Sequence, residues 1–268
     1  MNRLSLNQIT TKRWSLPEAV RGCADAGVQW ISLWRDKVAE VGVDEAARLM
    51  RQHEVRPSSL CLGGFFTGMG PDGPTPDGIA DTTQAIDEAA RLGAKVLVLV
   101  VGGVADGDLA LSRRRVTEAL EQLVPVALDR GVQLGLEPLH PMQCAERSVL
   151  STLAQALDLA EPYPADAVGV VVDEFHVWWD PAIEQSLGGP DRRLPRLRPA
   201  RTAAGPPARA HAARRRPDRP PSPARVRRRG RLRRPYRGRG VQRRTLGPAG
   251  DEVLREVVSS YQAHVCPR

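Results

Sequence analysis

KVLVLVV, residues 95–101, is an unbroken run of apolar residues after its first lysine. A short continuous run of this kind is typical of a strand that is buried on both faces of a parallel sheet. An amphipathic stretch at 77–92 precedes the run and ends at Gly93, and a longer one at 109–130 follows it. We therefore predict a strand between two helices, which is the repeating unit of a parallel α/β fold.

The same alternation extends over the first 187 residues. Ser15, with Glu18 three positions later, forms a capping-box pattern that marks a helix start. No glycine fingerprint follows the first strand, which argues against a dinucleotide-binding sheet. Six successive βα units favour a (β/α)8 TIM barrel with right-handed crossovers. The other predicted strands are 4–8, 28–34, 58–62, 132–138 and 168–173, and the other predicted helices are 15–26, 43–53, 151–161 and 181–187.

The pattern changes abruptly after residue 187. Residues 188–247 contain 21 Arg, ten Pro and two Asp but no Lys or Glu, a net charge of +19, whereas the other 208 residues carry a net charge of −11. Such a segment cannot bury enough apolar area to offset its chain entropy, so we expect it to be irregular or disordered. Strands seven and eight are then disrupted, and the outer edges of strands one and six stay unpaired.

We divide the chain into three parts. Residues 1–187 form the first six βα units of the barrel, 188–247 form an Arg/Pro-rich low-complexity segment, and 248–268 form a C-terminal barrel helix, with an amphipathic pattern at 251–265. The four cysteines are scattered without a CxxC pair, which is typical of a reduced, cytoplasmic protein. No apolar run is long enough for a transmembrane helix, and no apolar secretion signal opens the chain.

Polar residues follow several predicted strands at their C-terminal ends, where the active sites of α/β barrels lie. Glu137 and Asp173 end neighbouring strands that are otherwise very apolar. Carboxylates in such a place need a partner, and a divalent cation can serve both of them. The other candidates, for binding a substrate, are His176, His140, Trp34, Arg35 and Asn7.

Each candidate also has a structural alternative. Glu137 or Asp173 can cap the next helix or pair with an arginine. His176 can pack between tryptophans, and tryptophans pack at a barrel rim more often than they stack on a sugar. Arg35 can hold a phosphate or carboxylate with two hydrogen bonds, or make a surface ion pair with Asp36 or Asp173.

The runs LSLNQITTKRWSLPEAV, GVQWISLWRDKVAEVG, LGLEPLHPM and VGVVVDEFHVWWDP resemble the sugar phosphate isomerase/epimerase family of xylose isomerase-like TIM barrels. The resemblance covers residues 1–187 and the last helix. It implies one divalent metal ion (Mn, Mg, Co or Zn), held by Glu, Asp, His and Glu from four strands, and proton transfer next to a sugar carbonyl. By this match Glu137 is a ligand and the acid/base, Asp173 is a ligand, and His176 contacts substrate oxygens.

The family's third and fourth ligands, in motifs like GFHVxD and VEVF, are missing from the sequence as written. Read one nucleotide later, GC-rich codons for PDRRLPRLR permit RIAGFHVCD, those for HAARRRPDRP permit MLPGDGRID, and those for RGRGVQ permit VEVFN. These family motifs come in the right order and at the right spacing. We therefore hypothesise two compensating frameshifts, near Gly188 and near Gly247, which resequencing of the coding DNA would test.

The expected function is that of a metal-dependent sugar or sugar-phosphate isomerase/epimerase, with little or no activity in this chain. One alternative is a non-catalytic or nucleic-acid-binding protein that uses the Arg-rich segment. A second is a dehydratase or lyase on the same barrel, since the first chemical steps are shared. An abasic-site endonuclease is disfavoured, because it needs a multi-zinc cluster and the chain has five histidines in total. The expected partner is a small sugar or sugar phosphate, and we expect no membrane and no specific nucleic acid as partners. Assembly into a homo-oligomer is compatible with the sequence.

Overall fold

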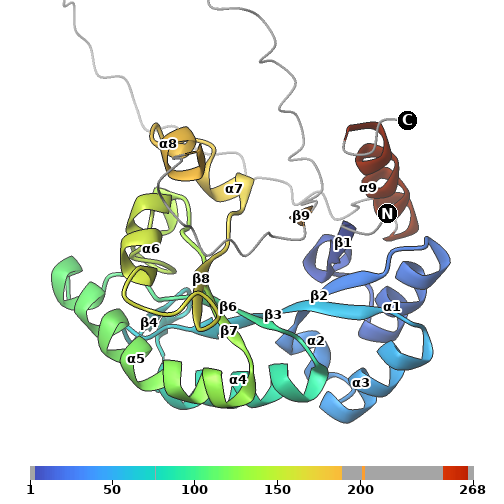
Figure 1. Cartoon of the computed structure of the whole chain (residues 1–268), viewed down its shortest axis with the longest axis horizontal. Coiled ribbons are helices and arrows are strands. Elements are labelled where there is room, and N and C mark those ends of the chain that lie inside the picture. Colours follow the sequence, from blue (N-terminus) through green and yellow to red (C-terminus); the bar gives the residue numbers. More distant parts are fainter. Residues whose placement is uncertain (1–3, 76, 189–200, 203–249, 265–268) are drawn as a thin grey trace, which may run out of the picture.

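The computed structural model describes residues 4–75, 77–188, 201–202 and 250–264. Its main sheet has seven strands in the order β8-β7-β6-β3-β2-β1-β9, and all neighbouring strands are parallel. From β1 to β8 the strands of this sheet follow one another in chain order, as in an α/β barrel (Figure 1). They are β1 (Leu4–Asn7), β2 (Trp30–Trp34), β3 (Arg56–Gly64), β6 (Val96–Val100), β7 (Gln133–Leu136), β8 (Val168–Val170) and β9 (Arg201–Thr202).

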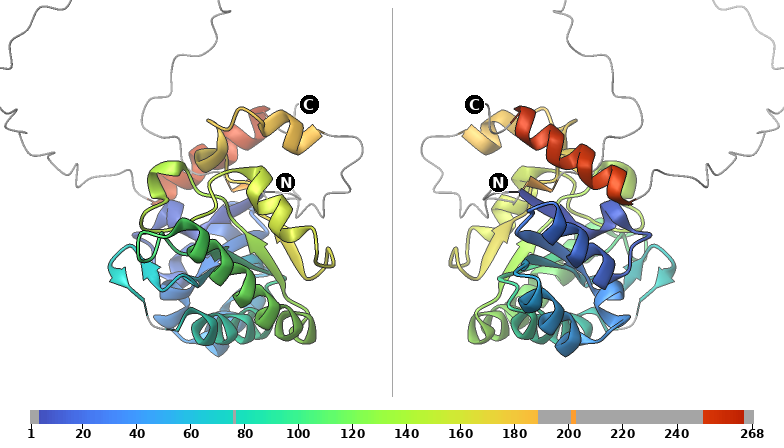
Figure 2. Two further views of the ribbon diagram at one scale, coloured as in Figure 1. Left: turned by 90° about the vertical axis from the view of Figure 1, so that its left-hand side faces the viewer. Right: turned by 90° about the vertical axis from the view of Figure 1, so that its right-hand side faces the viewer.

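Helices connect the strands, and in the view of Figure 1 α3, α4 and α5 lie below the sheet while α7, α8 and α9 lie above it. The last helix, α9, contacts α1 and β1, and its Leu254 and Val257 are buried (Figure 2). No helix in the described part of the chain is long and apolar enough to cross a membrane. The helices are α1 (Leu16–Asp25), α2 (Arg35–Ala39), α3 (Val43–Gln52), α4 (Gly78–Leu92), α5 (Leu109–Arg130), α6 (Leu153–Ala160), α7 (Glu174–Val177), α8 (Ile183–Gly188) and α9 (Gly250–His264), with 3-10 turns η1 (Gln8–Thr11) and η2 (Pro141–Gln143).

Local sequence signals set the ends of these helices. The capping box predicted at Ser15 and Glu18 is present at the start of α1, where each side chain bonds the other residue's backbone. Gly93 ends α4 with a φ of 78°, in the left-handed region that glycine enters without strain. These signals explain why the predicted helix limits agree with the observed ones to within about two residues.

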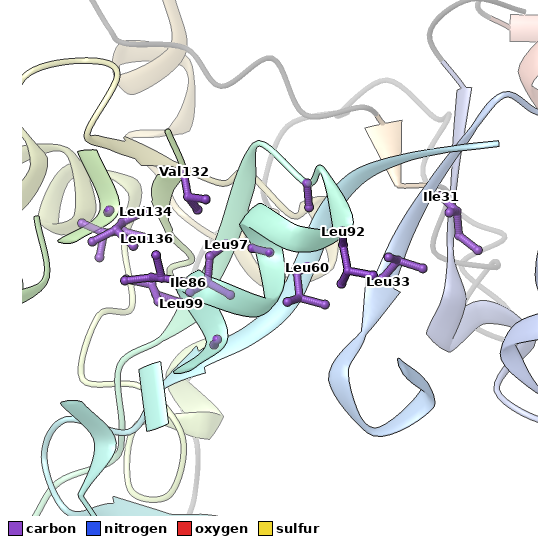
Figure 3. Close-up of a cluster of buried hydrophobic side chains, with 14 of the residues drawn as sticks. Ile31, Leu33, Leu60, Ile86, Leu92, Leu97, Leu99, Val132, Leu134 and Leu136 are labelled. Atoms are coloured by element: carbon purple, nitrogen blue, oxygen red, sulfur yellow. The ribbon is translucent and has the colours of Figure 1, made fainter. Parts of the chain in front are cut away.

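The core lies between the sheet and its helices. Figure 3 shows the side chains of Leu60, Leu97 and Leu99, from β3 and β6, beside Ile86 and Leu92 of α4. All of these residues are buried. Apolar burial of this kind is the main favourable term in folding, at about 25 cal/mol per Å² removed from water.

The structure corrects the prediction at four places. Helices α2 and α7 were not predicted, and the Gly/Pro-rich loop after β3 contains a short hairpin of β4 (Met69–Gly70) and β5 (Gly73–Pro74). The edge of β1 is paired with β9, which lies inside the segment predicted to have no strand. Within the described residues β8 has one strand neighbour, β7. The rest of 188–247, and the proposed frameshift, lies outside the described residues.

Candidate functional site

Two carboxylates follow neighbouring strands at the C-terminal end of the sheet. Glu137 comes directly after β7, and its backbone N–H donates to the Leu99 carbonyl of β6 at 3.1 Å. Asp173 comes after β8 and caps α7, accepting a hydrogen bond at 2.8 Å from the backbone N–H of Phe175. Because β7 and β8 are parallel neighbours, both side chains come to the same end of the barrel. The helix-capping alternative for Asp173 is therefore present as well.

The charge of Asp173 influences the protonation of Glu137. Burial raises the pKa of Glu137 to about 8, the negative charge of Asp173 adds to the rise, and the positive charge of Arg147 opposes it. A carboxyl group with a pKa near neutrality can both hold and release a proton under ordinary conditions. The pair therefore has the electrostatics of an acid/base site.

His176 and His140 complete this group, which we call the β7–β8 cluster (Glu137, Asp173, His140 and His176). The backbone N–H of His140 donates to Nδ1 of His176 at 3.4 Å. Burial lowers the pKa of His176, the charges of Arg147 and His140 add to this effect, and Asp173 works against it. The ring is therefore favoured in its neutral form, with Nδ1 as acceptor and the proton on Nε2.

Aromatic side chains lie beside the cluster. The His140 ring stacks on Trp178 with the ring centres 6.1 Å apart, and it meets the edge of Trp179 at 5.8 Å. Trp179 is fixed by a 2.8 Å hydrogen bond from its Nε1 to the carbonyl of His176. Trp178 and Phe175 are exposed, at 70% and 52%. The cluster therefore has a partly exposed aromatic rim, which can pack on the C–H faces of a sugar.

Asn7 and Trp34 contact each other at the ends of β1 and β2. Nε1 of Trp34 donates to Oδ1 of Asn7 at 2.9 Å, and the backbone N–H of Trp34 donates to Oε1 of Gln8 at 2.9 Å. Nε2 of Gln8 is buried, and among the described residues it finds no hydrogen-bond partner. The bonds fix both predicted residues in place, and their roles in binding a substrate stay predictions.

Arg35 is not part of the cluster. Its guanidinium pairs with Asp81 at 2.8 Å and with Glu88 at 2.7 Å, both on α4. The structural alternative of an ion pair is therefore present, but the partners named for it, Asp36 and Asp173, were wrong. Burial lowers the pKa of Arg35, but hydrogen bonds to Glu88 and Asp81 outweigh it and raise the pKa overall. These contacts tie the start of α2 to α4 and already engage the guanidinium that was expected to bind a substrate.

No sequence pattern singled out Arg147, whose positive charge acts on two residues of the β7–β8 cluster. Its charge acts on Glu137 and His176, and also on the thiol of Cys61 in β3, whose pKa burial raises well above its usual value. Arg147 lies in the connection between β7 and α6, ten residues after Glu137. Neither a strand end nor a known motif marks that position, so only the folded chain reveals it.

The side chains of the β7–β8 cluster could form part of a binding site for a divalent cation. Two half-buried carboxylates on neighbouring strands would be stabilised by a divalent cation between them, because its charge offsets theirs. However, no group of three or more His, Cys, Asp or Glu side chains among the described residues is arranged to hold a metal ion. Glu137 and Asp173 therefore offer about half of the ligands that the family resemblance implies.

Residues 20–209 match the family model described as xylose isomerase-like TIM barrel, and this match covers more than half of the chain. The chain belongs to the xylose isomerase-like TIM barrel family. The predicted fold class and the predicted family are thereby confirmed.

Similar proteins share this barrel over part of their length. A crystal structure of protein SMc04130 from Sinorhizobium meliloti 1021 is 42% identical with a TM-score of 0.63, over 69% of this chain and 67% of that one. The inosose isomerase of Bacillus velezensis is 26% identical over 65% of this chain, and the match spans only 63% of the relative's length. The IolI protein, solved with a zinc atom, is 22% identical with a TM-score of 0.53 over 65% of this chain and 63% of that one, and this likeness concerns the fold.

Proposed function

We propose that the β7–β8 cluster is the site of a cation-dependent sugar isomerase or epimerase, which moves a proton at the carbon next to a carbonyl. The observation that carries the proposal is the carboxyl group of Glu137, whose pKa is raised to about 8 by burial and by Asp173 at the strand ends of the barrel. The inosose isomerase relative supports the reaction class. The Arg-rich segment on which a nucleic-acid-binding function would depend lies largely outside the described residues.

In this proposal Glu137 removes the proton from the carbon beside the carbonyl. The electrons of the C–H bond form a C=C bond, and the carbonyl oxygen takes up the negative charge, giving an enediolate. Returning the proton to the neighbouring carbon completes an isomerisation. Epimerisation instead needs a second acid on the opposite face, which the resemblance places in the VEVF-like motif missing from this sequence.

His176 and Asp173 have supporting roles in the proposal. With Nδ1 accepting from His140, the Nε2–H of His176 is free to donate to a substrate oxygen. Asp173 and Glu137 would hold the divalent cation, which when bound polarises the carbonyl and the adjacent hydroxyl. Since the chain as written supplies two of the four expected ligands, we propose weak cation binding and impaired turnover.

The test is exchange of a carbon-bound hydrogen with D2O, followed by NMR or mass spectrometry. An inosose and simple ketoses are the first substrates, with Mn²⁺ added or chelated. We expect a frame-restored version to exchange only with Mn²⁺, and Glu137→Gln in that version to lower the rate by about 100-fold or more. The matched control is Glu146→Gln, an exposed neighbour. Full exchange by the Glu137→Gln variant would remove Glu137 from the mechanism, and Mn²⁺-dependent turnover by the mass-verified chain as written would refute the impairment.

A further inference from the structure

Arg147 is held rigidly above the end of β6. Its carbonyl accepts a hydrogen bond from the N–H of Gly102 at 2.9 Å, and its own N–H donates to the carbonyl of Gln143 at 2.8 Å. On the far side, the N–H of Val149 donates to the carbonyl of Gly102 at 2.9 Å. A Cβ at Gly103 would lie 2.3 Å from the Ala145 carbonyl, so this close approach of the two segments requires glycine. The backbone of Arg147 is therefore fixed from both sides.

Arg147 is half-buried, and its positive charge acts on Glu137 and His176. Within the described residues, however, its side chain makes no hydrogen bond and no ion pair. This contrasts with Arg35, which has two carboxylate partners in contact. A partly buried cation without an anion in contact keeps its N–H donors available for an anionic ligand, and partial burial strengthens that attraction compared with open water.

The carboxylates of the cluster do not fill that role. Glu137 and Asp173 stay beyond ion-pair distance of Arg147 among the described contacts, and Asp173 already accepts from the N–H of Phe175. The two carboxylates thus remain available for a cation, while Arg147 remains available for a negatively charged group. A guanidinium suits this task because it offers parallel N–H donors to phosphate or carboxylate oxygens.

We propose that Arg147 binds an anionic group of the substrate, so that the site selects a phosphorylated or carboxylated sugar over a neutral one. The inference deepens the proposed function and rests on it for the position of the reacting carbonyl. Phosphate and carboxylate share the chemistry that a guanidinium recognises, and the choice between them is left to the experiment.

The probes are three small ketones that share one hydroxymethyl ketone unit. Dihydroxyacetone is neutral, dihydroxyacetone phosphate carries a phosphate, and hydroxypyruvate carries a carboxylate. Binding to the full chain is measured by calorimetry with Mn²⁺ present, for the wild type and for Arg147→Gln and Arg147→Lys. Since the 21 arginines of 188–247 also attract anions, the readout is the difference between each variant and the wild type, with Arg51→Gln on α3 as the matched control.

We expect the wild type to bind at least one charged probe about tenfold more tightly than the neutral one. Arg147→Gln should remove this preference without changing the affinity for dihydroxyacetone, and Arg147→Lys should keep part of it. The probe that loses most affinity identifies the anion. Equal binding of charged and neutral probes by the wild type, or a preference unchanged in Arg147→Gln, would overturn the inference.

Hydrogen exchange separates this inference from the proposed function. If the frame-restored version exchanges a carbon-bound hydrogen but shows no Arg147-dependent preference, only the inference fails. If the preference is present but exchange is absent or independent of Glu137, the proposed function fails while the anion site stands. The Glu137→Gln variant should therefore lose exchange and keep the preference for charged probes.

Discussion

Two groups of charged side chains in this barrel differ in whether opposite charges are in contact. On the α4 side, Arg35 makes ion pairs with Asp81 and Glu88 at 2.8 and 2.7 Å, and Arg35 and Glu88 are largely buried. At the end of β7 and β8, the charges of Asp173 and Arg147 act on the pKa of Glu137, and the described residues show no ion pair among the three. The first arrangement satisfies its charges within the protein. In the second, none of the three charges has an opposite charge in contact among the described residues, and perturbed groups of this kind are often found where a ligand binds.

The comparison explains why a charged residue at a strand end is ambiguous in sequence. Arg35 and Glu137 both follow apolar strands, and both were predicted to face a substrate. Only the packing of α4 against β3 turns Arg35 into a structural residue, by placing Glu88 beside it. In the function that we propose, the lack of an ion-pair partner, rather than position in the strand pattern, distinguishes Glu137 from Arg35.

The largest expected effect concerns the pH dependence of stability at Glu137. Its pKa is about 8 in the folded chain against 4.5 for an ordinary glutamate, so the folded state binds more protons between these values. Its favourable contribution is then complete below the unfolded pKa and is lost as pH rises through the folded one. Each factor of ten in proton affinity corresponds to about 1.4 kcal/mol, so Glu137→Gln should become more stable than the wild type by several kcal/mol toward pH about 9.

Urea unfolding from about pH 5 to about pH 9, with a chelator present, measures this difference. The groups whose charges face Glu137 are Asp173 and Arg147, and the Cys61 thiol shares the same environment. The control Glu146→Gln, at an exposed position, should follow the wild type throughout. Parallel stability curves for the wild type and Glu137→Gln would contradict the buried-carboxylate description.

The α4 ion pairs should give a smaller effect without a strong pH dependence near neutrality. Arg35→Met leaves Glu88, whose side chain is 15% exposed, without its cation, and we expect a loss of about 2 kcal/mol in unfolding free energy. Arg91→Met breaks the exposed pair with Asp44 and should cost less than about 0.5 kcal/mol. Equal losses in the two variants would show that the Arg35 pairs are not protected from solvent.

The sequence was sufficient for the parts of the fold that local signals determine. Apolar runs such as 95–101 and caps such as Ser15 and Gly93 placed six strands and their helices, because burial and backbone capping act over a few residues. The same reasoning brought Glu137 and Asp173 together, since successive parallel strands end at the same side of the barrel.

The rest depends on contacts between segments far apart in the chain. Arg147 is fixed through Gly102 and faces the cluster only once β6 and β7 are side by side. The partners of Arg35 lie 46 and 53 residues further on, at a distance that no local pattern encodes. The pairing of β1 with β9 involves a segment whose composition predicts no strand. None of these features leaves a periodic signal.

The smallest expected effect separates the two roles of Asp173. It caps α7 through the N–H of Phe175, and its charge helps to raise the pKa of Glu137. Asp173→Asn keeps a capping oxygen and removes the charge, so the fold should be as stable as the wild type and the rise in the Glu137 pKa should shrink. Asp173→Ala also loses the cap and should cost about 1 kcal/mol, measured by urea unfolding at about pH 5, where Glu137 is protonated. If the Asn and Ala variants lose stability equally, the hydrogen bond that caps α7 contributes little to stability. The effect of Asp173 would then come from its charge alone.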